Sequence, residues 1–153
     1  MPLNFRFIGF ILEAFPEAKI VHLNRDARAT CWSIYKYFFK SDGHGFAHNF
    51  EDLFSYYSLY LDLMDFWRKI YPDKIYDISY EDLTTNQELE TRKLLNYCNL
   101  EWDDDCLSFH KNKRAVKTTS ALQVRQKMYQ GSSEAWKKYE PFLKPLVDGL
   151  KSF

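Results

Sequence analysis

Arg25 and Ser33 have the residue types and the spacing to hold an anion together. The guanidinium group of arginine is permanently charged, and its planar fork binds phosphate through two parallel hydrogen bonds. If a helix begins after Arg25, Ser33 lies about two turns further along the chain and adds a hydroxyl donor. The alternative is structural: Arg25 pairs with a nearby carboxylate, and Asp26 only caps the helix. The pattern of these residues leaves both interpretations open.

A second concentration of positive charge lies between His110 and Gly131, where the sequence shows no helical or strand periodicity. A stretch of about 20 residues without regular structure is uncommon in a compact domain and is usually functional or disordered. Runs of charge are most often solvated surface. The neighbouring hydroxyl groups nevertheless favour an anion site, because hydroxyls and cations together suit phosphate or sulfate. The cations are Lys111, Lys113, Arg114, Lys117, Arg125 and Lys127, and the hydroxyls belong to Thr118, Thr119 and Ser120.

Motifs for several other chemistries are absent from the sequence. There is no Cys-x-x-Cys pair, no Gly-x-Ser-x-Gly motif and no glycine-rich phosphate loop, because the five glycines lie far apart. His44 and His48 have the spacing of two metal ligands on a helix. Glycines in and beside that interval disfavour the helix, and no third ligand is evident nearby. We therefore expect no bound metal.

The residues around Arg25 predict a strand that leads directly into a helix. Residues 18–23 are apolar and partly β-branched, which suits a buried strand. Asp26 stands at the N-cap position of a helix over residues 27–36. An earlier helix is expected over residues 3–15, where apolar residues recur at helical spacing before Pro16. Since ligands bind at the carboxyl ends of parallel strands, this order places Arg25 at a ligand-binding edge.

Several helices are predicted in the rest of the chain. Apolar residues three or four apart predict a long helix from Phe50 onward, and its wide apolar stripe indicates cover on more than one side. Residues 85–88 form a capping box for a further helix, and residues 102–109 predict a short one started by Asp103. Residues 132–153 predict one or two closing helices. The residues expected to face inward there are Trp136, Tyr139, Phe142, Leu143 and Leu146.

Residues 74–78 predict a second short strand. Two strands, each preceded by a helix, indicate an α/β sheet in a mostly helical chain. Two strands are too few for an independent sheet of this type. A further strand is therefore missing, either from this interpretation of the sequence or from the chain.

The composition is that of one globular domain. The chain has 153 residues, of which 46% are apolar and 27% charged, and this excludes a disordered tail. Its 21 basic and 21 acidic residues cancel, which argues against non-specific binding of nucleic acid. No apolar run approaches the roughly 20 residues that span a bilayer, and the start lacks the features of a signal peptide. Three scattered cysteines do not suggest a disulfide framework. We expect a cytoplasmic protein that binds neither nucleic acid nor membrane.

Three segments together resemble the sulfotransferase family. Residues 25–33 match the family's 3′-phosphate-binding motif, Arg-Asp-x-Arg-Ala-x-x-x-Ser. Residues 80–83, Tyr-Glu-Asp-Leu, are similar to its Tyr-Glu-x-Leu motif, and residues 123–140 resemble its carboxyl-terminal segment that covers the cofactor. The resemblance is closest to bacterial sulfotransferases linked to tetratricopeptide repeats, with tyrosylprotein sulfotransferases more distant. It runs over residues 2–150, and several motifs in the correct order make it specific.

The resemblance implies transfer of a sulfuryl group from 3′-phosphoadenosine 5′-phosphosulfate (PAPS) to a hydroxyl or amine, with no metal. By position, Arg25 and Ser33 would hold the 3′-phosphate, and Tyr80 would lie near the adenine. Arg125 would belong to the segment that closes over the nucleotide. Ser120 corresponds to a serine that contacts the phosphosulfate end of PAPS.

The chain departs from the family pattern at its start. In the family, a strand, a glycine-rich P-loop and a helix precede the segments found here, and the general base also lies upstream. Lys127 replaces a proline that is frequent in the family. The resemblance thus implies a P-loop-NTPase-like three-layer α/β fold without its amino-terminal P-loop strand and helix. Residues 1–153 would form the carboxyl-terminal portion of one sulfotransferase domain.

Two functional interpretations remain open at this stage. In the first, the chain supplies the 3′-phosphate and adenine side of a PAPS site, for an acceptor that the sequence does not identify. In the second, it is a non-catalytic remnant that binds nucleotide weakly or serves as an association module. An exposed sheet edge would then favour self-association.

Overall fold

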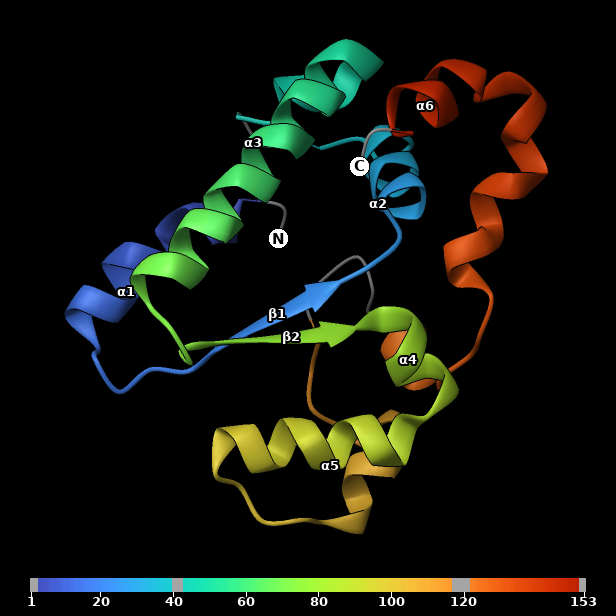
Figure 1. Ribbon diagram of the computed structural model, residues 1–153. Coiled ribbons are helices and arrows are strands. Elements are labelled where there is room, and N and C mark those ends of the chain that lie inside the picture. Colours follow the sequence, from blue (N-terminus) through green and yellow to red (C-terminus); the bar gives the residue numbers. More distant parts are fainter. Residues whose placement is uncertain (1–2, 40–42, 117–121, 152–153) are drawn as a thin grey trace.

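Two parallel strands form the centre of the fold, and helices cover both of their faces. The computed structural model describes residues 3–39, 43–116 and 122–151. Strand β1 (Ile20–Asn24) pairs in parallel with β2 (Ile75–Ser79), with His22 opposite Asp77. Figure 1 shows α1 and α3 over one face of this sheet and α5 on the other side. The sequence-based expectation of an α/β sheet in a mostly helical chain is therefore confirmed.

The helices follow the predicted order, with several short 3₁₀ segments between them. The α-helices are α1 (Ile8–Ala14), α2 (Ala27–Tyr35), α3 (Phe50–Ile70), α4 (Tyr80–Thr85), α5 (Gln87–Cys98) and α6 (Lys144–Gly149). The 3₁₀-helices are η1 (Asn4–Phe7), η2 (Gly45–His48), η3 (Asp104–Lys111), η4 (Gln123–Arg125) and η5 (Ser132–Phe142). Among residues 3–39, 43–116 and 122–151, no helix combines the length and apolar character needed to cross a bilayer.

Short polar side chains fix where the helices near the sheet begin. Asp26 accepts a hydrogen bond from the Ala29 amide (2.9 Å) and starts α2, as predicted. The predicted capping box at residues 85–88 is wrong. Thr85 is the last residue of α4, and its hydroxyl donates to the carbonyl of Glu81 instead. Ser79 starts α4, whose six residues are too few to show a periodicity in the sequence.

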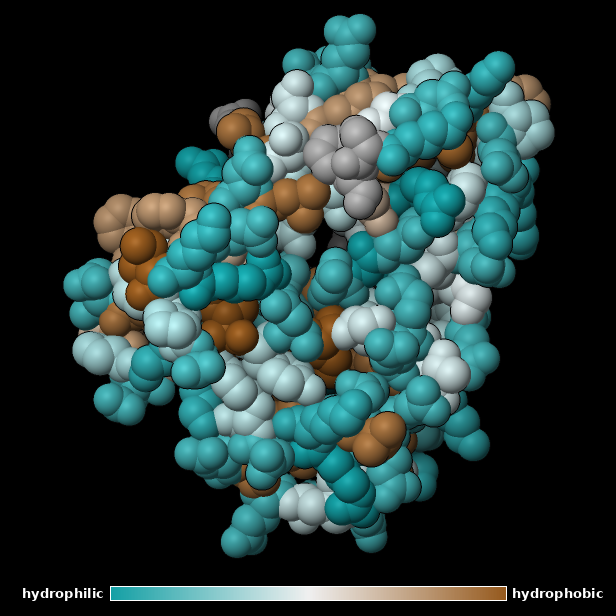
Figure 2. Space-filling view, viewed as in Figure 1, coloured by the Kyte–Doolittle hydropathy of each residue, from teal (hydrophilic) through white to brown (hydrophobic). Residues whose placement is uncertain are grey.

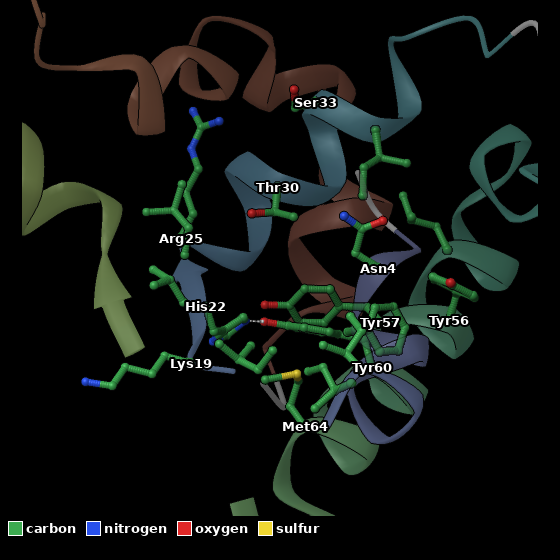
Figure 3. Close-up of a pocket in the computed structure, with 18 residues that line it drawn as sticks. Asn4, Lys19, His22, Arg25, Thr30, Ser33, Tyr56, Tyr57, Tyr60 and Met64 are labelled. Atoms are coloured by element: carbon green, nitrogen blue, oxygen red, sulfur yellow. Dashed lines mark hydrogen bonds between the residues drawn. The ribbon is translucent and has the colours of Figure 1, made fainter. Parts of the chain in front are cut away.

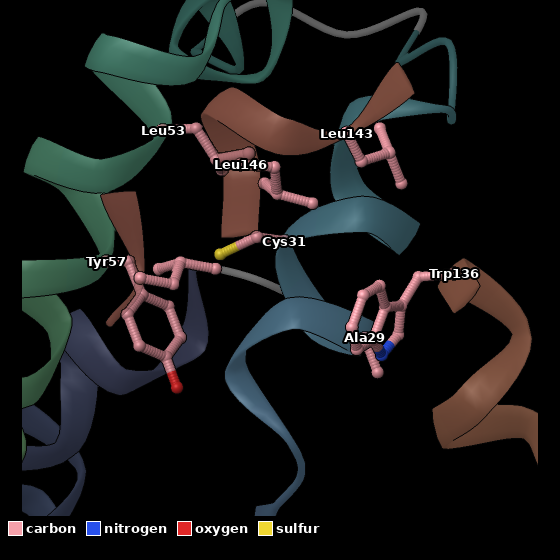
Figure 4. Close-up of a cluster of buried hydrophobic side chains, with 8 residues drawn as sticks. Ala29, Cys31, Leu53, Tyr57, Trp136, Leu143 and Leu146 are labelled. Carbon is pink, nitrogen blue, oxygen red and sulfur yellow. The ribbon is translucent and has the colours of Figure 1, made fainter. Parts of the chain in front are cut away.

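The buried apolar side chains form two clusters that share α3. The larger lies where α2, α3, η5 and α6 meet, and Figure 4 shows Leu146 near Cys31 and Trp136 near Ala29 within it. Gly149 allows close contact, because a Cβ atom there would stand 2.2 Å from the ring of Phe54. The second cluster joins α1 to α3 above the strands through Ile8, Leu12 and Met64.

Two expectations about burial are wrong. Tyr139 is 49% exposed and Phe142 is 83% exposed, whereas Trp136 and Leu146 are buried as predicted. Tyr139 packs its ring on Trp32 at the margin of the core, and Phe142 stands where η5 ends before α6. The expected second cover of α3 is also not seen among the residues that the structure describes. The exposed apolar residues on α3 are Leu59, Phe66 and Ile70.

Candidate functional site

Arg25 lies immediately after β1 and is bound to residues from the far end of the sequence. Its Nε donates to the hydroxyl of Ser133 (3.1 Å), and its Nη2 donates to the carbonyl of Ser132 (2.7 Å). Within the described residues, no carboxylate lies at ion-pair distance from Arg25, and its Nη1 makes no hydrogen bond. The structural alternative, in which Arg25 pairs with a carboxylate, is therefore not what the structure shows. The guanidinium group keeps both its charge and free donors.

Tyr80 packs beside Arg25 at the carboxyl end of β2. The guanidinium carbon lies 4.8 Å from the centre of the Tyr80 ring, within cation–π distance. The hydroxyls of Tyr80 and Ser132 share a hydrogen bond of 2.7 Å. Tyr80 is the first residue of α4, so the end of β2 places it directly next to the end of β1. We refer to Arg25, Tyr80, Glu81, Ser132 and Ser133 as the polar corner.

Glu81 ties the polar corner to the turn after β1. Its Oε1 accepts a hydrogen bond from the Asp26 amide (3.2 Å). Burial raises the pKa of Glu81, but hydrogen bonds from Ser133 and the Asp26 amide, with the charge of Arg25, outweigh it and hold the pKa below 4.5. An ionised carboxylate therefore holds the Arg25 loop in place without neutralising Arg25 through direct contact.

Asp26 and Arg28 support the same turn. Arg28 pairs with Asp26 (2.7 Å), and its guanidinium carbon lies 4.8 Å from the ring centre of Trp136. Burial raises the pKa of Asp26, but hydrogen bonds from Arg28 and the Ala29 amide outweigh it and hold the pKa below 3.8. The two residues thus join the start of α2 to η5, the helix that also brings Ser132 and Ser133 to Arg25.

Arg25 and Ser33 line one end of a cavity of about 660 Å³. In Figure 3 both lie at the end of the cavity formed by the β1–α2 turn and α2, with Thr30 between them. The opposite end is apolar and aromatic, with Tyr57, Tyr60 and Met64 among its residues. Figure 2 shows the surface hollowed above β1, between α3 and α2. The structure thus brings Arg25 and Ser33 to a common space, at the polar end of a mostly apolar cavity.

The cavity follows the free edge of β1. Five consecutive residues from Lys19 to Leu23 line it, which only an edge of a strand allows, because successive side chains point to opposite faces. The Ile20 amide donates to the carbonyl of Lys74, so alternate residues of β1 face β2. The main-chain groups of Val21 and Leu23 consequently face the open edge. Their side chains are 43% and 52% exposed. We call this part of the cavity the edge groove.

A polar network in the middle of the sheet escaped the sequence analysis. His22 Nδ1 donates to Asp77 (2.5 Å), and its Nε2 shares a hydrogen bond with the hydroxyl of Tyr60 (2.6 Å). Arg68 donates to both oxygens of Asp77, at 3.0 and 2.8 Å. Burial raises the pKa of Asp77, but the hydrogen bonds from Arg68 and His22 outweigh it and hold the pKa below 3.8. The network fastens α3 to both strands.

Arg125, another predicted site residue, is not part of the polar corner. Arg125 is exposed and donates to the carbonyl of Arg114, and no hydrogen bond joins it to Arg25 or Tyr80 in the described part of the chain. Ser120 lies outside the described residues. Among the residues that the structure describes, no group of three or more His, Cys, Asp or Glu side chains could hold a metal ion.

Comparison with known proteins agrees with the motifs at this site. The model of the sulfotransferase family matches residues 1–104, which include Arg25, Ser33 and Tyr80. This chain belongs to the sulfotransferase family. It is also 37% identical, over 99% of its length, to a protein of Aquifex aeolicus (strain VF5) described only as uncharacterized. The chain spans about a fifth of that relative's length, at 20%.

Sequence reasoning missed the roles of Ser132, Ser133 and Glu81 in this sulfotransferase-family chain. Both serines and Glu81 lie inside the motifs that carry the family resemblance, so a signal was present. The motifs do not reveal that Arg25 contacts Ser133, because the two residues are more than a hundred positions apart in the sequence. Only the fold of η5 against α2 brings them together.

Proposed function

We propose that this chain supplies the 3′-phosphate and adenine side of a PAPS site, in an enzyme that transfers a sulfuryl group to a hydroxyl or amine. The observation that carries the proposal is that the charge of Arg25 is not neutralised by a neighbouring side chain in the described residues. Arg25 is a cation without a carboxylate partner in the described residues, and it shares a cavity with Ser33. An anion with several acceptor oxygens, such as a phosphate monoester, matches a guanidinium group with free donors and a neighbouring hydroxyl.

Each residue of the polar corner has a distinct part in the proposed site. The 3′-phosphate would accept hydrogen bonds from Arg25 Nη1 and the hydroxyl of Ser33. Arg25 lies over one face of Tyr80, so the adenine would stack on the opposite face. Ser132, Ser133 and Glu81 would act indirectly, by fixing the guanidinium plane before the nucleotide arrives. Sulfuryl transfer is an in-line displacement, for which fixed positioning of the donor is a large part of catalysis.

We further propose that the edge groove receives another parallel strand, which extends the sheet toward the three-layer P-loop-NTPase-like fold. The unpaired main-chain groups of Val21 and Leu23 and the apolar walls from α1 and α3 support this. Residues outside these 153 would supply the strand and the groups that bind the 5′-phosphosulfate. The activity of the whole protein would then depend on that segment as well as on the polar corner.

Titration calorimetry with adenosine 3′,5′-bisphosphate tests the nucleotide site. We expect binding by this chain, and Arg25→Ala should weaken it by about 2–4 kcal/mol, as for a buried charge that loses its partner. Arg92→Ala is the matched control, because Arg92 lies in α5, away from the corner, where it pairs with Glu88 and stacks on Trp102, which follows α5. Equal affinity of Arg25→Ala and the unmodified chain would reject the assignment of Arg25 to the 3′-phosphate.

Hydrogen exchange of the β1 amides tests the edge groove. In this chain the amides of Val21 and Leu23 should exchange much faster than those of His22 and Asn24, which face β2. In a longer polypeptide that supplies the additional strand, all of them should become protected. If Val21 and Leu23 are already protected in a monomer of this chain, the groove is closed and the proposed strand has no place to bind.

A second candidate function is association through the same edge, without catalysis. The observation in its favour is that the edge groove is open and lined by apolar residues. Sedimentation velocity, which measures the oligomeric state, distinguishes the two candidates when it is combined with the calorimetric titration. Concentration-dependent dimers without affinity for adenosine 3′,5′-bisphosphate would favour association, and a monomer that binds the nucleotide would favour the first proposal.

A further inference from the structure

A second cavity, of about 340 Å³, lies on the other side of the sheet from α3. Its walls come from the start of α5, the end of η3 and the segment that follows η4. In Figure 1, η3 and α5 lie side by side below β2. The polar residues of its lining are Gln87, Ser108, His110, Lys111 and Lys127. None of them belongs to the polar corner or the edge groove, so the cavity is separate from the proposed nucleotide site.

The lysines of this cavity carry unpaired charge. In the described part of the chain, neither Lys111 nor Lys127 has a carboxylate at ion-pair distance, and both are exposed. By contrast, Lys93, Lys137 and Lys151 each pair with an acidic residue of the same helix or turn. The nearby Glu88 is paired with Arg92. The two lysines therefore bring positive charge to a cavity whose described lining contains no carboxylate.

His110 adds an imidazole ring to the two lysine charges in the lining of this cavity. Its Nδ1 is buried and has no hydrogen-bond partner among the described residues. Nε2 makes no hydrogen bond with the described residues and is left to donate to a ligand. Ser108 contributes a hydroxyl and Gln87 an amide to the same lining. This set is rich in donors and positive charge, and it lacks a carboxylate that would repel an anion.

We propose that this cavity binds a phosphate or sulfate group. The amines of Lys111 and Lys127 and the Nε2–H of His110 would donate to its oxygens, with the hydroxyl of Ser108 as a fourth donor. A tetrahedral oxyanion offers several acceptors in different directions, which suits donors that approach from two separate segments of the chain, η3 and the segment after η4. A volume of about 340 Å³ exceeds that of the oxyanion alone, so the site has room for an ester that carries such a group.

Nuclear magnetic resonance titration with inorganic phosphate tests this site in the 153-residue chain. We expect backbone amides of residues 107–111 and 127–128 to shift with a saturable, millimolar dissociation constant. The double variant Lys111→Gln/Lys127→Gln should weaken binding by about tenfold, since it removes two charge-assisted hydrogen bonds from exposed groups. The control, Lys137→Gln/Lys151→Gln, removes the same charge from paired lysines elsewhere and should leave the affinity unchanged.

Further titrations identify the source of the anion. They also define the results that would overturn the proposal. Glucose 6-phosphate that binds more tightly than inorganic phosphate would identify an ester as the ligand, and equal affinity would identify the free oxyanion. Equal weakening in both double variants, or equal shifts with sodium chloride at the same ionic strength, would show only general attraction and reject the site. Arg25→Ala should not alter these shifts, so this result is independent of the nucleotide proposal.

Discussion

The polar corner and the edge groove are parts of the same strand, yet the chain completes one and leaves the other open. At the carboxyl end of β1, Arg25 receives partners from residues 80 and 132–133, so its guanidinium plane is fixed. Along the free edge of β1, Val21 and Leu23 have exposed side chains, and their main-chain groups have no partner in the described part of the chain. The comparison shows that the geometry of the proposed binding group, Arg25, does not require a complete sheet.

The difference has a simple physical origin. The corner rests on the larger apolar cluster, where α6 and η5 close over α2, so the helix that carries Ser33 is held from several sides. The edge groove has only walls, formed by α1 and α3, and nothing in the described residues pairs with β1 on that side. Burial of the apolar cluster stabilises the first region, whereas the second keeps apolar surface in contact with water.

The largest expected effect is on stability. Leu146 is fully buried beside Cys31 and Leu53, so Leu146→Ala should lower the free energy of unfolding by about 2–5 kcal/mol. Leu23→Ala makes the same change at the exposed edge and should cost less than about 1 kcal/mol. Urea denaturation measures both variants.

Equal losses in the free energy of unfolding for Leu146→Ala and Leu23→Ala would contradict the contrast between the buried cluster and the open edge groove. Leu23 would then be buried in solution, which requires that a second copy of the chain or an unexpected segment covers the edge groove. Repeating the denaturation over a range of protein concentrations distinguishes these cases, because only association makes the midpoint depend on concentration.

The next effect concerns Tyr80 in the polar corner. Tyr80→Ala should weaken the binding of adenosine 3′,5′-bisphosphate by about 1–3 kcal/mol, because an aromatic face for the adenine is lost. Tyr80→Phe keeps the ring and loses only the hydrogen bond with Ser132, so the affinity should change little. Calorimetry and thermal denaturation are needed together. If Tyr80→Ala lowers stability but leaves the affinity unchanged, Tyr80 serves only to pack against Arg25.

Much of the fold is predictable from local signals in the sequence. Pro16 ends the first helix, Asp26 starts α2, and the wide apolar stripe of α3 marks a helix that runs to Ile70. The two strands are recognisable as short apolar runs after helices. These features depend on neighbours within a few residues, which is why a single sequence suffices to find them.

What the sequence does not give is contact over long separations. The register that sets His22 opposite Asp77 decides whether those side chains meet, and no local pattern encodes it. The contacts of Arg25 with Ser132 and Ser133 likewise depend on how η5 packs on α2. The burial of Tyr139 and Phe142 was mispredicted for the same reason, because apolar character alone does not reveal where the core ends.

The smallest effect is the dependence of stability on acid pH. The lowered pKa of Asp77 means that its charged form stabilises the folded chain above pH 3.8, and this stabilisation is lost as the pH falls further. Asp77→Asn should therefore reduce stability at neutral pH by less than about 1 kcal/mol, because the carboxylate is 44% exposed and screened. The difference between variant and unmodified chain should shrink below pH 3.8.

Glu81→Gln sharpens the same measurement, because the two carboxylates are held differently. Asp77 has an ion pair with Arg68, whereas Glu81 accepts hydrogen bonds from Ser133 and the Asp26 amide and only senses the charge of Arg25. High salt should consequently reduce the cost of Asp77→Asn more than that of Glu81→Gln, since salt screens exposed charge pairs more than hydrogen bonds. An equal response to salt would mean that direct ion pairing, not hydrogen bonding, also holds Glu81, and the picture of an unneutralised Arg25 would then fail.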